Sequence, residues 1–161
     1  MRKTARDIAF KLVFESLINQ SGGNITYRKF CEPLDADDRA YVDEILSGVR
    51  DSKTVLDGVI EGYASGFSLS RIYKIDRAVL LVAVYEILYK DDVPVKVSAN
   101  EAVELAKTYS TDNSPAFING ILASVIKDRD GILSAAASQA PGEAERAPKS
   151  PEPGENADKA T

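Results

Sequence analysis

Residues 75–89, with the sequence IDRAVLLVAVYEILY, carry apolar side chains on nearly every face of a helix. A helix of that kind is normally buried on all sides. The many β-branched residues make a strand the competing interpretation, but a run of this length without glycine or proline favours a helix. We therefore predict a buried central helix around which the rest of the chain packs.

The segments on both sides of this run repeat their apolar residues at helical spacing, and none alternates with a period of two. We predict helices over about 5–19, 37–49, 53–63, 69–72, 98–109 and 117–131. Residues 21–36 are predicted to be a loop with a short helical turn at 27–30. The N-caps are assigned to Thr4, Asp37 or Asp38, Ser52 and Ser98. The fold class is all-α, a compact bundle of six to seven helices.

The composition changes abruptly at residue 135. Residues 135–161 contain four prolines and no aromatic, Leu, Ile, Val or Met residue. Such a segment cannot bury enough apolar surface to offset the entropy of ordering it. We therefore expect a helical domain over 1–134 and a disordered tail rich in Pro, Ala and Glu over 135–161, acting mainly as a solvating extension.

Several function classes are disfavoured by composition. The chain has no histidine and one cysteine, Cys31, so histidine metal sites and Ser-His-Asp triads are excluded. No pair of carboxylates can be placed in one apolar cleft, and no phosphate-binding glycine motif is present. No apolar run approaches the roughly 20 residues of a membrane span. We expect a soluble cytoplasmic protein that is not an enzyme, with no catalytic residue, metal or cofactor.

A basic cluster stands at the start of this acidic chain. Arg2, Lys3, Arg6 and Lys11 lie in the first turns of the first predicted helix, whereas the whole chain has a net charge of −5. Cations at this spacing are suited to the phosphates of a nucleic acid, whose binding would then depend on salt. The alternative is an ordinary solvated helix face.

A second candidate lies at residues 110–120. Asn113, Ser114 and Asn119 carry groups that can hydrogen-bond bases or phosphates, and Phe117 can stack on an unpaired base. The alternative for Phe117 is the helix core, because it is spaced four residues from Ile121.

Four segments resemble the NusB family of transcription antitermination factors. They are Arg2–Arg6 (RKTAR), Ile75–Leu80 (IDRAVL) followed by Tyr85-Glu86, Val93-Pro94 with Asn100–Lys107 (NEAVELAK), and Phe117–Leu122 (FINGIL). The resemblance implies two packed helical subdomains. It also implies binding of boxA RNA, a single-stranded element of ribosomal RNA transcripts, together with the ribosomal protein NusE, and loading of an antitermination complex onto RNA polymerase. The broad apolar faces would also allow a homodimer.

The resemblance also implies roles for individual residues. Asp76 falls on an acidic position that faces the partner. The positions expected to contact RNA are Arg2, Lys3, Arg6, Phe14, Asn113, Ser114 and Phe117. We expect the first helical turns and the approach to the last helix to meet as one RNA-binding surface.

Three residues depart from the family pattern. Leu81 stands where the family commonly has Arg, Ala116 stands where Lys is frequent, and Pro115 stiffens the loop before the last helix. These departures affect the expected RNA affinity and leave the fold expectation unchanged. The alternative function is a helical protein-interaction module without RNA binding, which would disperse the basic residues over the surface.

Overall fold

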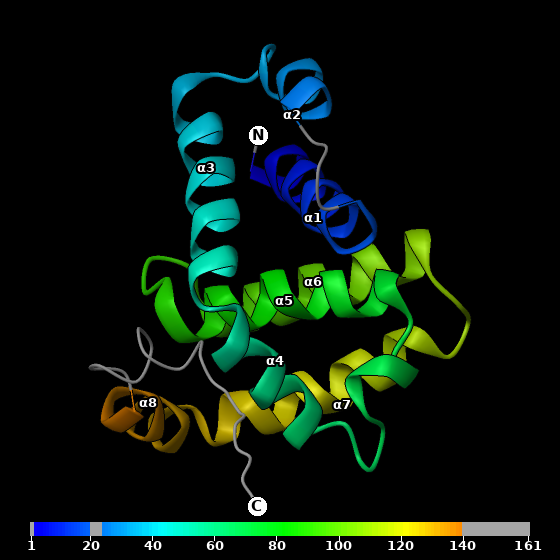
Figure 1. The fold of residues 1–161 in the computed structure, drawn as a ribbon, viewed down its shortest axis with the longest axis vertical. Helices are drawn as coiled ribbons and strands as arrows, with labels where there is room; N and C mark the ends of the chain where they lie inside the picture. The colour runs from blue at the N-terminus through cyan, green and yellow to red at the C-terminus, as the bar shows by residue number, and fades with distance from the viewer. Residues whose placement is uncertain (1, 20–23, 140–161) are drawn as a thin grey trace, which may run out of the picture. The chain divides into compact units, whose positions relative to one another are not determined.

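The computed structural model describes residues 2–19 and 24–139, and these residues are helical throughout apart from their connections (Figure 1). The prediction of an all-α fold is confirmed, with slightly more helices than the six or seven expected. The helices are α1 (Arg2–Ile18), α2 (Asn24–Cys31), α3 (Ala36–Asp51), α4 (Lys53–Gly62), the short 3-10 helix η1 (Leu69–Arg71), α5 (Lys74–Tyr89), α6 (Val95–Tyr109), α7 (Ser114–Lys127) and α8 (Arg129–Gln139).

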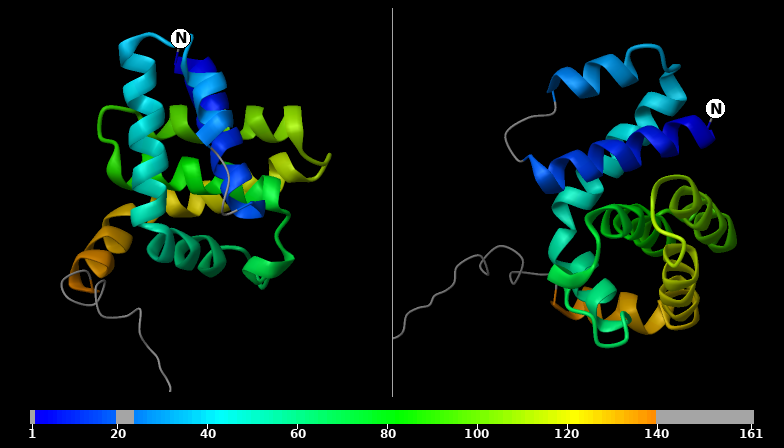
Figure 2. Two further views of the ribbon diagram at one scale, coloured as in Figure 1. Left: turned by 45° about the horizontal axis from the view of Figure 1, so that its top comes forward. Right: turned by 90° about the vertical axis from the view of Figure 1, so that its right-hand side faces the viewer.

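The helix α5 is the centre of the bundle, as its sequence predicted. Its side chains from Ala78 to Val84 are all buried, and it packs against α1, α3, α4, α6 and α7. Figure 1 shows α1, α2 and α3 on one side of α5 and α6, with α4 and α7 on the other, and Figure 2 shows the same division from two further directions. The predicted pair of packed helical subdomains corresponds to these two groups.

The chain divides at Lys127 into two compact units, of which the first holds α1 to α7 and the second holds α8. The helix α8 continues to Gln139, past residue 135 where the tail was predicted to begin. The remaining residues of that predicted tail, 140–161, lie outside the described residues. Among the described helices none is long and apolar enough to cross a bilayer.

Several predicted helix starts are wrong. α1 already includes Thr4, and α6 begins directly after Pro94, which places Ser98 inside the helix rather than at its cap. α3 is capped by Asp35, whose carboxylate accepts the backbone N–H of Asp38 at 2.8 Å. The segment predicted to be a loop over 21–36 contains the helix α2, which closes against α1.

Candidate nucleic-acid and partner interface

The basic residues of α1 lie beside a groove that α1 forms with α6. The groove has a volume of about 360 Å³. Its α1 side is lined by Lys3, Thr4, Arg6 and Asp7, and its α6 side by Glu101, Glu104, Leu105, Thr108 and Tyr109. We call it the α1–α6 groove.

The cations at this groove are matched by carboxylates. The Lys3 ammonium lies 3.0 Å from Glu101 Oε1, and the Lys11 ammonium lies 2.9 Å from Asp7 Oδ2. The hydrogen bond from Lys11 to Asp7 raises the pKa of Lys11 above its ordinary value, so this side chain stays cationic. The groove therefore presents alternating charges, and a phosphate would have to compete with these carboxylates for the two lysines.

Arg6, which was predicted to contact RNA, points into the protein instead. The residue is 5% exposed, and Arg6 Nε donates to Glu86 Oε2 at 3.1 Å. The same carboxylate accepts hydrogen bonds from the Tyr41 hydroxyl and, at 2.7 Å on its other oxygen, from Ser98 Oγ. We call Arg6, Tyr41, Glu86 and Ser98 the Glu86 cluster. The interpretation of Arg6 as a surface phosphate contact is therefore not supported by its position.

The surroundings of the Glu86 cluster favour the protonated forms of Arg6 and Tyr41. Burial alone would lower the pKa of Arg6, but the neighbouring Tyr41 and Glu86 raise it above the ordinary value. Burial and the Glu86 carboxylate raise the pKa of Tyr41 as well, so its hydroxyl keeps the proton that it donates. A buried cation, a buried anion and two hydroxyl donors thus join α1, α3, α5 and α6.

The other predicted α1 residues lie closer to the surface. The Arg2 guanidinium lies 4.4 Å from the centre of the Tyr41 ring, with 40% of its side chain exposed, and its Nε is 3.7 Å from Asp38 Oδ1. Lys3 is the most exposed of the three predicted cations, with 68% of its side chain accessible. Phe14 is half-buried. Arg2 and Lys3 remain available to a ligand, since a large part of each side chain is exposed.

A second hollow, of about 340 Å³, lies where α7 begins. We call it the α7 pocket. It brings together three predicted RNA-binding residues and the predicted partner residue with side chains that the sequence did not single out. Its lining consists of Phe67, Arg71, Ile72, Tyr73, Asp76, Thr111, Asn113, Ser114 and Phe117.

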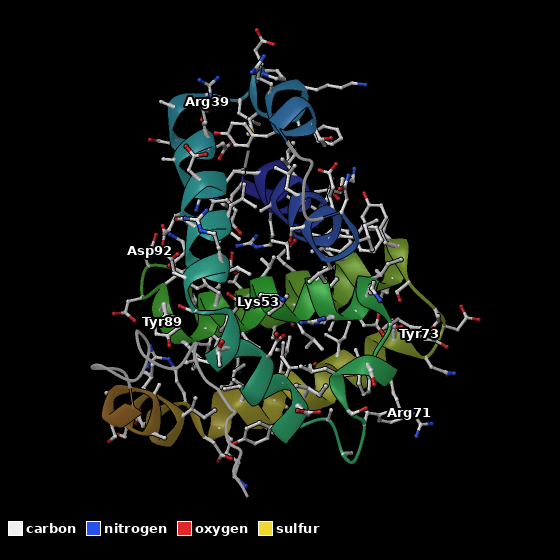
Figure 3. The ribbon with its side chains drawn as sticks, in the orientation of Figure 1. Arg39, Lys53, Arg71, Tyr73, Tyr89 and Asp92 are labelled. Atoms are coloured by element: carbon white, nitrogen blue, oxygen red, sulfur yellow. The ribbon has the colours of Figure 1, made fainter. Side chains whose placement is uncertain are left out.

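The rim of the α7 pocket is aromatic and partly basic. Tyr73 is 63% exposed and Phe67 is 42% exposed, and Figure 3 shows Tyr73 and Arg71 projecting outward from the segment before α5. The Phe117 ring is half-buried and meets the Phe67 ring edge to face at 5.7 Å between centres. Phe117 thus packs against Phe67 and also lines the α7 pocket. Its position is intermediate between the two alternatives, a core residue and a ring open to an unpaired base.

Asp76 and Ser114, predicted to face a partner and RNA, are both buried. Asp76 is 3% exposed and Ser114 is 2% exposed. Ser110 Oγ donates to one oxygen of the Asp76 carboxylate at 2.6 Å, and Ser114 Oγ donates to the other at 2.9 Å. The buried positions of Asp76 and Ser114 therefore indicate a structural role for both residues. Asn113, in contrast, is exposed at the pocket rim.

The two predicted stretches flank the C-terminal end of α6 rather than sharing one pocket. Tyr109 lines the α1–α6 groove, where its hydroxyl donates to Asp7 at 2.7 Å and its ring lies 5.3 Å from that of Phe10. Thr111, two residues later, lines the α7 pocket. Where one RNA-binding surface was expected, the structure has two hollows. The turn that follows α6 lies between them. No group of side chains suited to a metal ion occurs in the part of the chain that the structure describes.

Comparison with known proteins agrees with this architecture. The NusB family model matches residues 3–127. The transcription antitermination protein NusB of Ruminiclostridium cellulolyticum is 44% identical over 128 residues, which cover 78% of this chain and 88% of that protein.

Two solved structures share the fold. The structure of T. maritima NusB is 30% identical, with a TM-score of 0.72, and the match covers 90% of this chain and 96% of that one. A structure of NusB and NusE in complex with double-stranded RNA is 22% identical, with a TM-score of 0.70 over 78% of this chain and 96% of that chain, and at this identity it speaks for the fold alone. The matched family model and the curated relative together establish that the chain belongs to the NusB family.

Proposed function

We propose that this chain is a transcription antitermination factor that binds boxA RNA together with NusE. In this role it helps to load an antitermination complex onto RNA polymerase in the cytoplasm, and it catalyses no reaction. The proposal is supported by family membership and by the names of the relatives, which are antitermination proteins. The two proposed partners, NusE and RNA, are the components that accompany NusB in the solved complex with double-stranded RNA that shares this fold.

The single observation that carries the RNA part of the proposal is the α7 pocket. Its rim offers the half-buried Phe117 ring, the exposed Tyr73 ring and the Asn113 amide. Unpaired bases are recognised by stacking on aromatic rings and by hydrogen bonds to their edges. A single-stranded RNA could place a base here, while its backbone passes the turn after α6 toward Lys3 and Arg2.

The charge of the protein explains why a partner is needed. Residues 1–134 carry a net charge of −3, and the lysines at the α1–α6 groove are matched by carboxylates. Few uncompensated cations give few released counterions, so RNA binding by this chain alone should be weak. A basic partner such as a ribosomal protein would extend the positive surface along the RNA.

The same charge pattern favours the alternative function, a protein-interaction module without RNA binding. The test is fluorescence anisotropy of a labelled boxA RNA with and without NusE, at salt concentrations from about 50 to 200 mM. The proposal expects binding that tightens when NusE is present and weakens with salt. Absence of binding at low salt with NusE present would leave the alternative.

Variants locate the RNA on the chain. Phe117→Leu keeps an apolar side chain but removes the ring, and should weaken binding about tenfold, since stacking contributes roughly 1–3 kcal/mol per base. Lys3→Ala should reduce the slope of log affinity against log salt by about 0.7. Tyr89→Leu, which removes an exposed ring outside both hollows, is the matched control and should bind like the unchanged protein.

A further inference from the structure

We propose that Asp76 is a positioning residue, which holds the loop 110–114 in its RNA-binding shape without contacting RNA or the protein partner itself. The inference rests on the proposed function and identifies what organises its principal site. Asp76 lies in the first turn of α5, yet its carboxylate is enclosed by the turn between α6 and α7. It therefore connects the central helix to the loop that carries Asn113.

The geometry accounts for both oxygens of the carboxylate. One accepts Ser110 Oγ at 2.6 Å and the other accepts Ser114 Oγ at 2.9 Å. Ser110 is the C-cap of α6, and Ser114 is the first residue of α7. One buried side chain thus joins the end of α6 and the start of α7 to the start of α5. Only residues 111–113 lie between the two serines, so fixing both serines restricts the conformation of these residues.

The direction of the hydrogen bonds extends this control to the pocket. A serine hydroxyl has a single hydrogen, and Ser114 gives its hydrogen to Asp76. Because the Thr111 and Ser114 hydroxyl oxygens are 2.8 Å apart, Thr111 must be the donor of that pair. The chain of donors therefore runs from Thr111 through Ser114 to the carboxylate. Thr111 lies on the wall of the α7 pocket, and Asn113 stands beside it.

A direct contact between Asp76 and a basic partner group is the competing interpretation. It would need the carboxylate to be reached from outside, but the residue is 3% exposed and both oxygens already accept hydroxyl hydrogens. A partner would have to break these bonds before it gained any. The geometry thus favours action through the loop.

Two substitutions of Asp76 separate these interpretations. In Asp76→Asn the amide oxygen can accept from Ser110 and the amide nitrogen can donate to Ser114, because a hydroxyl can do either. The loop should keep its shape although the negative charge is gone. In Asp76→Ala both serines lose their acceptor. Asp76→Ala should weaken binding of labelled boxA RNA in the presence of NusE about tenfold, the size expected from hydrogen bonds to a charged group. Asp76→Asn should stay within about threefold of the unchanged protein.

Hydrogen exchange of the free protein provides a readout that does not depend on RNA. The Ser114 and Phe117 amides donate to the carbonyls of Thr111 and Asn113, at 3.1 and 3.2 Å. Both amides should exchange faster in Asp76→Ala and at the normal rate in Asp76→Asn. If the unchanged protein binds no RNA, the proposed function fails, but these exchange rates still decide whether Asp76 holds the loop.

Serine variants keep the test decisive if Asp76→Ala does not fold. Ser114→Ala should reproduce the faster loop exchange and the weaker RNA binding. Ser98→Ala is the matched control, since Ser98 is also a buried serine that donates to a buried carboxylate, but it lies away from the loop. It should lower the melting temperature and leave loop exchange and RNA affinity unchanged.

Three results would overturn the inference. Equal loss of binding in Asp76→Asn and Asp76→Ala would mean that the charge itself contacts a partner. Unchanged loop exchange in both Asp76→Ala and Ser114→Ala would mean that the loop holds its shape without these bonds. Loop exchange accelerated equally by Ser98→Ala would mean that the effect is general destabilisation.

Discussion

Replacing Arg6 by methionine separates a structural role in the Glu86 cluster from an RNA contact. Methionine keeps most of the apolar volume of the arginine but removes the cation. The Glu86 carboxylate, 1% exposed, then remains in the core without its counter-charge. Removing one partner of a buried ion pair typically costs about 3–5 kcal/mol, because the remaining charge is left uncompensated.

The structure places the expected loss at the lower end of that range. In Arg6→Met the carboxylate still accepts hydrogen bonds from Tyr41 and from Ser98, the latter at 2.7 Å. We therefore expect a loss of about 3 kcal/mol. For a domain of this size that corresponds to a fall in melting temperature of about 10 °C. Urea unfolding followed by circular dichroism measures the free energy directly.

A double variant checks the pairing. Arg6→Met combined with Glu86→Gln removes both charges, so the uncompensated carboxylate disappears. The two losses should then be non-additive, and the double variant should unfold at a higher urea concentration than Arg6→Met alone. A combined loss equal to the sum of the single losses would show that the two side chains do not depend on each other.

RNA binding distinguishes the two roles of Arg6. If Arg6 contacts a phosphate, Arg6→Met should reduce the slope of log affinity against log salt by about 0.7. A residue of the Glu86 cluster should leave that slope unchanged at temperatures where the variant is folded. Arg6→Met with a loss of stability below about 1 kcal/mol and a reduced salt slope would refute our reasoning and restore Arg6 to the RNA-binding surface.

Two further predictions concern stability. Gly48→Ala would place a Cβ in a steric clash with the Tyr85 ring, so it should destabilise by about 1–2 kcal/mol in urea unfolding. Gly58→Ala, whose Cβ would meet nothing within 4 Å, should instead stabilise by about 0.5–1 kcal/mol, and equal effects would contradict the clash. The Lys90 ammonium, by donating to Asp92, lowers the pKa of Asp92 below its ordinary value of 3.8. The stability from this pair is thus present above that value and is lost as pH falls through the lowered pKa. The melting temperature of Asp92→Asn should lie below that of the unchanged protein at neutral pH and converge with it in acid, and a constant difference would argue against the pair.

The fold could be predicted because one segment leaves few choices. A helix that is apolar on every face must be surrounded, and the flanking segments each carry one apolar stripe to surround α5 with. Helix starts were less predictable. Ser98 and Glu101 have the spacing of a capping box, but Pro94 begins the helix one turn earlier, and the Ser98 hydroxyl is used by Glu86 instead.

The site was harder to predict because a polar residue near a helix start has two uses that the sequence pattern does not separate. Arg6 and Asp76 were both interpreted as contacts to a ligand, and both prove to be buried partners of other side chains. The choice depends on which face of the helix packs, and that face is set by distant segments: Glu86 is 80 residues from Arg6, and Ser114 is 38 residues from Asp76.

One sequence feature did carry this information. Glu86 is the single charged residue between Ala78 and Tyr89 in α5, and it lies in the buried part of that helix. A carboxylate in such a place needs a cation and hydroxyl donors from other helices. The basic cluster of α1 was therefore a candidate for the core as well as for RNA, and the structure divides it accordingly. Arg6 forms an ion pair with Glu86, while the side chains of Lys3 and Arg2 remain partly exposed at the surface. The proposed RNA binding by a chain of net negative charge is compatible with using one of its few clustered cations to hold α1 in place, because the helix that Arg6 anchors carries Arg2 and Lys3.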